Sequence, residues 1–258
     1  MQVELDPDPA WVEALSGHGR EAALHAVGEA QGERKLFSHL EREHDREGRD
    51  SYIEVDAPLE LHALVRLLRP VHVVEVGVSS GVSSAYLLNA LDKNGTGTLH
   101  SVDLPSLPRQ GARSQKPSRN SWSLPPGRST GWAVPFPLLK RWDLRLGDKA
   151  DVLPILARGL PRIDLLLYDV PHEDTATRRE FRLLDSLVPP GGVIIVDHGP
   201  RGGLCDALRG WARSWKTRPV RRQNLGLYGM RRPAPSRTPR TTRPSRGRPL
   251  NGEILKRG

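Results

Sequence analysis

Two carboxylates and a glycine-rich turn are the residues of this chain best suited to chemistry. The run Val71–Val76 reads as a β-strand that contains Glu75 near its end, and glycines follow at Gly77 and Gly81 before a helical stretch begins. Glycines let a ligand approach the backbone closely, and a helix N-terminus offers free N–H groups and positive dipole to an anion. A second predicted strand ends in Asp103. This arrangement predicts a site for a ribose-bearing cofactor.

The turn alone fits more than one kind of site. Dinucleotide-binding turns carry G-x-G-x-x-G, whereas the spacing here is G-x-x-x-G with Val78 after the first glycine, which disfavours a nicotinamide cofactor. The same residues match G-x-S-x-G, the nucleophile elbow of α/β-hydrolases, with Ser79 as nucleophile and Asp169 and His198 in hydrolase order. A hydrolase needs several strands before its nucleophile, and residues 1–70 look mainly helical. The hydrolase therefore stays an alternative.

A third interpretation covers more of the chain. The pattern Glu75-x-Gly77-x-x-x-Gly81 resembles motif I of class I S-adenosylmethionine-dependent methyltransferases. Further matching segments follow in order, ending with one that looks like the L-x-P-G-G turn before a fifth strand: Arg145–Asp148, Ile163–Asp169 and Leu187–Asp197. The resemblance implies a Rossmann-like α/β fold, with a mostly parallel seven-stranded sheet, an antiparallel edge strand and helices on both faces.

The resemblance also implies how the cofactor, S-adenosyl-L-methionine, is bound. In the family the glycine turn holds the methionine end, and the acid before it helps position the ammonium group. The acid that ends the second strand binds the ribose hydroxyls, and an acid after the third strand lies near the adenine amino group. The expected cofactor-binding residues are Glu75, Gly77, Ser79, Ser80, Gly81, Asp103 and Asp148.

The ends of the fourth and fifth strands carry the candidate catalytic groups. The segment from Asp169 to His172 resembles the D-x-x-H segment of methyltransferase type 24, a group that includes small-molecule O-methyltransferases. Such relatives use the aspartate as a magnesium ligand and the histidine as general base, which implies these roles for Asp169 and His172. The resemblance makes Asp197 a second metal ligand. His198 departs from the acidic pair of those relatives, so a metal-independent transfer stays an alternative.

The chemistry of these residue types agrees with the implied roles. The methyl group of a sulfonium is already electrophilic, so the enzyme must orient the acceptor and remove its proton. Histidine, with a pKa of about 6.5, suits that removal. Carboxylate oxygens are the hard ligands that Mg²⁺ prefers.

Composition places limits on the compartment. The one cysteine, Cys205, leaves no intrachain disulfide and favours a reducing compartment. The N-terminus lacks an apolar signal core, and no apolar run reaches the roughly 18–20 residues of a membrane span. We therefore expect a cytoplasmic protein.

The positive charge is concentrated at the C-terminus. From Lys216 onward the chain has 13 lysines and arginines against the single acid Glu253, whereas the rest carries a net charge of −3. Residues 232–258 are rich in proline, arginine, serine and threonine and are predicted to be disordered. A basic tail attracts nucleic acid or anionic lipid, but this tail has no aromatic residue for base stacking. A solvated tail without a specific partner stays an alternative.

Three parts are expected along the chain: a helical extension over residues 1–55, a methyltransferase domain over 56–231, and the tail over 232–258. Helices are predicted over 9–30 and 33–48, as a cap on the site, a contact between two copies, or packing on the core. Within the domain, residues 104–141 hold seven prolines and seven lysines or arginines without an acid. That segment is predicted to be either a lid over a negatively charged acceptor or a disordered insertion, and both alternatives stay open.

The sequence thus predicts an enzyme that transfers a methyl group from S-adenosylmethionine to a hydroxyl of a small-molecule acceptor. Mg²⁺ is the expected assisting metal. A nucleic-acid methyltransferase guided by the tail stays an alternative, although residues 169–172 lack the D/N-P-P-Y/F/W signature of enzymes that methylate base amino groups. A non-catalytic cofactor-binding protein also stays open.

Overall fold

The structure, a computed structural model, describes residues 6–47, 57–104, 124–125, 127–170, 174–197, 206–222 and 225–234. His172, His198 and Cys205 lie outside these ranges, as do residues 105–123 of the expected insertion and residues 235–258 of the expected tail.

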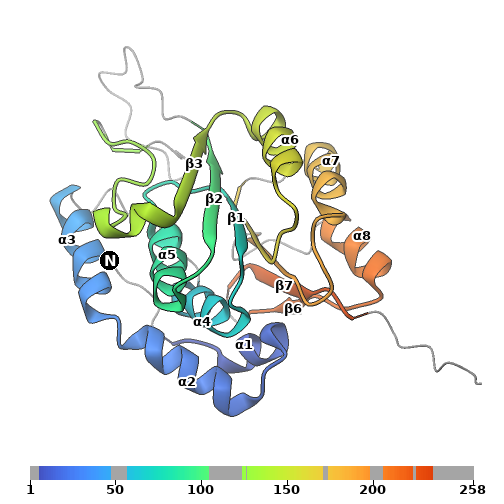
Figure 1. Cartoon of the computed structure of the whole chain (residues 1–258), viewed down its shortest axis with the longest axis horizontal. Helices are drawn as coiled ribbons and strands as arrows, with labels where there is room; N and C mark the ends of the chain where they lie inside the picture. The colour runs from blue at the N-terminus through green and yellow to red at the C-terminus, as the bar shows by residue number, and fades with distance from the viewer. Residues whose placement is uncertain are drawn as a thin grey trace, which may run out of the picture.

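A seven-stranded sheet occupies the centre of the molecule (Figure 1). Its strands are β1 (His72–Val76), β2 (Thr98–Asp103), β3 (Trp142–Leu146), β4 (Leu165–Tyr168), β5 (Val193–Asp197), β6 (Val220–Arg221) and β7 (Leu227–Arg231). They lie in the order β3-β2-β1-β4-β5-β7-β6, with β1 to β5 parallel, β7 antiparallel to β5, and β6 antiparallel to β7. The predicted fold class is confirmed. The strand order reverses between β1 and β4, so their carboxyl ends form the crevice where open α/β sheets bind ligands.

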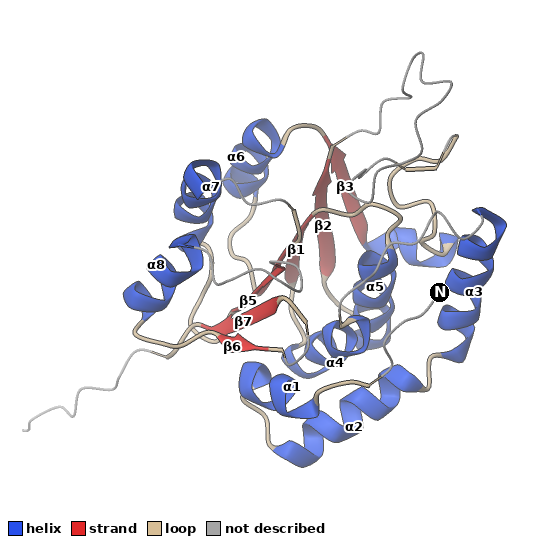
Figure 2. Ribbon diagram, turned by 180° about the vertical axis from the view of Figure 1, so that it is seen from behind, coloured by secondary structure: helices blue, strands red, loops and turns tan. Residues whose placement is uncertain are grey.

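Helices cover both faces of this sheet (Figure 2). They are α1 (Pro9–Ser16), α2 (Arg20–Gln31), α3 (Arg34–Glu47), α4 (Pro58–Leu68), α5 (Val82–Asn94), the 3-10 helix η2 (Phe136–Arg141), α6 (Lys149–Gly159), α7 (Asp174–Asp185) and α8 (Asp206–Trp215). Strand side chains alternate between two cores. For example, Val73 belongs to the core with α1 to α5, and Val74 belongs to the core with α6 to α8.

The helix predicted over residues 9–30 is two helices. Gly17 ends α1 in the left-handed conformation, with φ of 69°, and its N–H donates to the carbonyl of Glu13. The backbone then turns before α2 begins. The expectation of one helix was wrong because a left-handed residue reverses the chain direction, which glycine permits without steric strain.

The first helix packs into the core. Trp11 is 1% exposed, and its indole N–H donates to the carbonyl of Val220 at 3.0 Å. Leu15 is also 1% exposed and lies against Gly229 of β7, where a Cβ would come within 2.3 Å of the leucine. Burial of each such side chain contributes about 1.5–3 kcal/mol. Core packing, one of the three roles considered for these helices, is therefore confirmed for α1.

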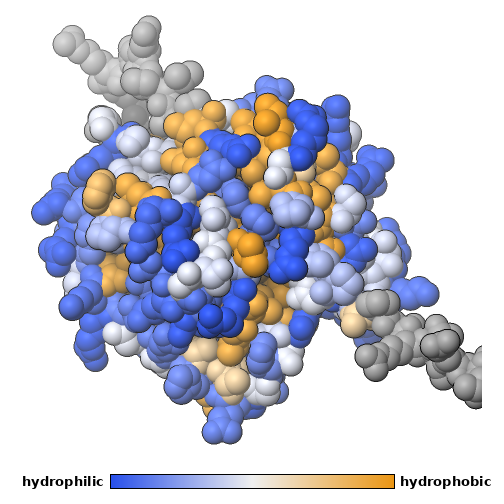
Figure 3. Space-filling model, in the orientation of Figure 1, coloured by the Kyte–Doolittle hydropathy of each residue, from blue (hydrophilic) through white to orange (hydrophobic). Residues whose placement is uncertain are grey.

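Trp211 and Trp215 of α8 pack in the other core. Their rings stack at 5.1 Å, and Trp211 also stacks on Phe181 of α7 at 4.6 Å. On the side of the molecule that Figure 3 shows, hydrophobic residues form several patches between larger hydrophilic areas. Among the helices in the described ranges, none is both long and apolar enough to cross a membrane.

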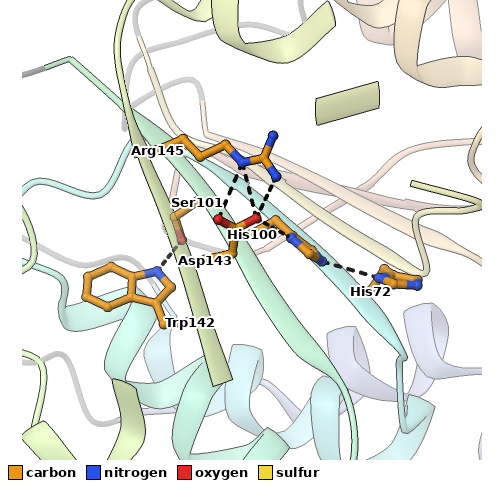
Figure 4. Close-up of polar contacts among 6 residues, drawn as sticks. All are labelled: His72, His100, Ser101, Trp142, Asp143 and Arg145. Carbon is orange, nitrogen blue, oxygen red and sulfur yellow. Dashed lines mark hydrogen bonds and ion pairs between the residues drawn. The ribbon is translucent and has the colours of Figure 1, made fainter. Parts of the chain in front are cut away.

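A chain of polar side chains crosses three strands on the face covered by α6 (Figure 4). The Nδ1 of His100 lies 3.0 Å from the carboxylate of Asp143, which Arg145 also contacts at 2.8 Å. Since a carboxylate only accepts, His100 donates from Nδ1, and its Nε2 lies 3.2 Å from Nδ1 of His72, within hydrogen-bonding distance. Burial lowers the pKa of His72, and the hydrogen bond from Arg145 lowers the pKa of Asp143. The chain links β1, β2 and β3.

Candidate functional site

The glycine turn after β1 is held between two other parts of the chain. A Cβ on Gly77, whose φ is 96°, would lie 1.9 Å from the carbonyl oxygen of Asp169. A Cβ on Gly81, whose φ is 90°, would lie 2.7 Å from Val134 and 2.9 Å from the Cα of Gly131. Both positions therefore need glycine for their conformation and for the close approach.

Asp103 fastens the turn to the end of β2. Its Oδ2 accepts the backbone N–H of Ser79 at 2.9 Å, and its Oδ1 accepts that of Leu104 at 2.9 Å. Ser79 has a φ of 54°, an uncommon value for a residue other than glycine. Burial raises the pKa of Asp103, and the hydrogen bond from Ser79 opposes that rise. The carboxylate is half-buried, so a ligand hydroxyl can approach its exposed part.

Unlike Asp103, Glu75 is fully enclosed by other parts of the protein. Its side chain is 0% exposed. The hydroxyl of Ser83 donates to one oxygen, and those of Ser84 and Ser101 donate to the other, each at 2.7 Å. Burial raises the pKa of Glu75, and the three hydroxyls act in the opposite direction. Glu75 thus connects β1 to β2 and to the start of α5, and its contact with a cofactor ammonium stays a prediction.

The start of α5 provides donors for a polar ligand. Gly81 is its N-cap, without a side-chain hydrogen bond to the first turn. Beside it, the hydroxyl of Ser80 is buried and has no hydrogen-bond partner within the described part of the chain. Free N–H groups and an unused buried hydroxyl fit the polar end of an amino-acid-like group. The residues present therefore fit the expected cofactor.

The ends of β2 and β3 add an apolar surface that the sequence did not single out. Leu104, which directly follows Asp103, is 62% exposed. Leu146, which pairs with Asp103 in the register of β2 and β3, is 50% exposed. Asp148 follows, accepts the N–H of Ala150 at 2.8 Å and caps α6. Two exposed leucines beside a carboxylate suit a flat heterocycle with an amino group. In the sequence, their position immediately beside two predicted strand ends was the signal that could have identified these leucines.

Asp169 and Asp197 lie at neighbouring strand ends. Tyr168 of β4 pairs with Val196 of β5, so each aspartate directly follows one member of that pair. Asp169 is exposed, and its N–H donates to Val76 at 2.8 Å, beside the glycine turn. The structure thus brings the two expected metal ligands to one edge of the sheet. Within the residues that can be placed, no group of three or more His, Cys, Asp or Glu could hold a metal ion, and His172 lies outside them.

A buried network supports this end of β4. Lys149 donates to the hydroxyl of Tyr168 at 2.8 Å, and that hydroxyl donates to Glu180 of α7. Lys149 also lies 3.3 Å from Glu180. The network joins the residue after Asp148 to the residue before Asp169. It thereby fixes two candidate site segments relative to each other.

The described end of the 104–141 segment lies directly on the glycine turn. The N–H of Gly131 donates to Ser79 at 2.8 Å, and that of Ala133 donates to Ser80 at 3.0 Å. From α3, His39 Nε2 donates to the carbonyl of Ala133 at 3.1 Å. Sequence reasoning missed these contacts, because backbone hydrogen bonds between distant segments leave no pattern in residue types. The lid role stays a prediction, since residues 105–123 lie outside the described ranges.

The side chains of this segment extend the contact to α3. The ring of Trp132 lies 5.0 Å from that of His44, and the guanidinium of Arg128 lies 4.8 Å above the tryptophan. The outer side of the turn is thus covered by α3 and by the end of the segment.

Comparison with known proteins gives a consistent result. Residues 74–198 match a family described as a methyltransferase domain. No curated protein matches the chain. Solved structures that resemble it include an O-methyltransferase from Klebsiella pneumoniae described as putative (17% identity, 77% of this chain and 90% of that one, TM-score 0.49). Another is an O-methyltransferase from Bacillus cereus in complex with SAH (14% identity, 76% of this chain and 88% of that one, TM-score 0.48). A third is the O-methyltransferase TomG from Streptomyces achromogenes in complex with SAM (19% identity, 89% of this chain and 97% of that one, TM-score 0.46). The family match spans the turn and the ends of β1 to β5.

Proposed function

We propose that this S-adenosylmethionine-dependent methyltransferase, whose residues 74–198 match a methyltransferase-domain family, acts on a hydroxyl of a small molecule. The observation that carries the proposal is the placement of Asp169 and Asp197 at adjacent strand ends beside the glycine turn. Carboxylates there can bind and orient a hydroxylated acceptor next to the cofactor.

The cofactor would lie along the carboxyl ends of β1 to β3. The exposed part of the Asp103 carboxylate would accept the ribose hydroxyls, and Leu104 and Leu146 offer an apolar surface for adenine. Asp148 would accept the adenine amino group. The buried hydroxyl of Ser80 and the start of α5 would receive the methionine end.

The acceptor side needs orientation and a base. In the reaction the methyl carbon leaves sulfur and bonds to the acceptor oxygen, and the hydroxyl proton must be taken up by a nearby group. His172 is our candidate for that base, and Asp169 and Asp197 would orient the acceptor. Bound at these carboxylates, Mg²⁺ would lower the pKa of the acceptor hydroxyl.

The test compares two substitutions in the full chain. Purified His172→Ala and Asp169→Asn proteins are assayed for transfer of labelled methyl groups from S-adenosylmethionine to a panel of phenols, catechols and sugars. Transfer should fall at least about 100-fold, the usual contribution of a general base. Cofactor affinity, measured by calorimetry, should stay within about threefold of wild type.

Asp206→Asn is the matched control, because that aspartate lies on α8 in an exposed pair with Arg178. Wild-type transfer by His172→Ala would overturn the base assignment. Transfer that survives removal of divalent metal would overturn the Mg²⁺ part alone. If no acceptor of the panel is methylated while wild type still binds the cofactor, the small-molecule proposal fails.

The family match gives no support to the alternatives considered from sequence.

A further inference from the structure

The outer side of α7 and α8 carries a concentration of basic side chains. The two helices lie side by side in Figures 1 and 2, joined by the stacked rings of Phe181 and Trp211. Their exposed lysines and arginines, with those of the segment that follows α8, form what we call the basic face: Arg179, Arg182, Arg209, Arg213, Lys216 and Arg218. Arg209 and Arg213 are four residues apart and so point in similar directions from α8.

Basic residues outnumber acids in this region, because residues 174–185 and 206–218 together hold seven lysines and arginines against four acids. The acids of α7 and α8 whose side chains are described are Glu180, Asp185 and Asp206. Glu180 is buried beside Lys149, Asp185 accepts from the indole of Trp215, and Asp206 pairs with Arg178. Each is already engaged with another group. The basic face therefore presents a net positive potential to solvent.

The residue types favour one class of anion. Five of the six residues are arginines, whose planar guanidinium binds phosphate through two parallel hydrogen bonds. A protein interface, in contrast, has an apolar centre. The large hydrophobic side chains that are exposed in the described residues all lie elsewhere, for example on α2, η2 and α6. The face likewise offers no apolar side chain for insertion into a lipid surface.

The chain continues from the sheet beside this face. The guanidinium of Arg232, just past β7, lies 5.1 Å above the ring of Trp215 at the end of α8. The sequence that follows, residues 235–258, contains seven lysines or arginines and one acid. Arg232 is thus adjacent to the end of α8, where the basic face continues to Lys216.

We propose that the basic face binds the phosphate backbone of a nucleic acid. The proposal is independent of the methyl acceptor, because the face lies on two helices outside the carboxyl ends of the strands. The phosphates of several successive nucleotides would contact the arginines of α7 and α8 together.

The test measures binding of a fluorescent single-stranded RNA to the full chain by anisotropy, over a range of salt concentrations. The variant Arg179→Glu/Arg182→Glu/Arg213→Glu removes three contacts. Since each phosphate contact contributes about 0.7 to the slope of log affinity against log salt, that slope should fall by about 2. Affinity at low salt should drop at least tenfold.

The matched control is Arg34→Glu/Lys35→Glu/Arg42→Glu, which changes the net charge equally on exposed residues of α3. It should reduce affinity less than threefold. Equal losses in both variants would overturn the proposal, because net charge alone would then explain binding. Binding of phosphatidylserine vesicles but not of RNA would overturn it too. Unfolding midpoints of both variants, measured beforehand, ensure that only folded proteins are compared.

Discussion

Glu75 and Asp103 are two carboxylates near the ends of adjacent strands, and their surroundings differ. Glu75 is 0% exposed and accepts three serine hydroxyls. Asp103 is half-buried and accepts two backbone N–H groups. Burial raises the pKa of both. The difference lies in exposure, because solvent reaches the carboxylate of Asp103 but not that of Glu75.

This difference indicates that Glu75 stabilises the turn, whereas Asp103 is the candidate for ligand binding. The hydroxyls around Glu75 come from β2 and from the first turn of α5, so the carboxylate stabilises the strand–turn–helix unit. The donors on Asp103 belong to the turn and to its own neighbour, and part of its carboxylate is exposed. For two acids that the family resemblance assigns to the same cofactor, we therefore predict separable roles.

The largest expected effect is on stability, from Glu75→Ala. Three buried hydroxyls would lose their acceptor, and a cavity would form, at a total cost of about 3–5 kcal/mol. Urea unfolding followed by circular dichroism measures this loss. Ser101→Ala, which removes one of the three donors, should cost only about 1 kcal/mol. Equal losses for the two variants would contradict the central role of Glu75.

Asp103→Asn should mainly affect cofactor binding. A hydrogen bond to a charged group contributes about 1.5–3 kcal/mol, so loss of the charge should weaken S-adenosylmethionine binding at least tenfold. Stability should fall by only about 1 kcal/mol, because the amide oxygen still accepts one backbone N–H. Calorimetric titration gives the affinity. Unchanged affinity would remove Asp103 from the cofactor site.

The pH dependence of stability gives a smaller effect. Burial raises the pKa of Glu75 above its ordinary value of 4.5, so the folded protein keeps this proton at a pH where the unfolded protein has released it. The free energy of unfolding therefore falls as the pH rises from 4.5 through the raised pKa. In Glu75→Gln that contribution is absent, and the slope over this interval should be flatter. Parallel slopes for the two proteins would argue against a raised pKa.

Trp142→Phe should have the smallest effect. The indole N–H donates to the hydroxyl of Ser101 at 2.8 Å, which in turn donates to Glu75. Its removal leaves all three hydroxyl bonds to Glu75 in place, so the loss should be about 1 kcal/mol. Cofactor affinity should not change. A loss in affinity as large as that of Asp103→Asn would show that the two clusters are coupled.

Local patterns in the sequence predicted much of the fold. The runs that became β1, β4 and β5 are short, mostly apolar and bounded by turn residues, so their burial on both faces could be expected. In the first thirty residues the pattern failed, because alternating small and apolar residues on both sides of Gly17 do not show that this glycine is left-handed.

Likewise, part of the candidate site could be predicted from the sequence and part could not. By itself, the sequence determined the glycine turn, the acids at the strand ends and the succession of strands along the chain, because each follows from residue types close together in the chain. Only the tertiary structure decided that Glu75 is enclosed by serines, that Asp103 remains open, and that Gly131 and Ala133 bond to the turn. These outcomes depend on which distant segments pack against each other, and that packing sets the free energy of burying or exposing a carboxylate.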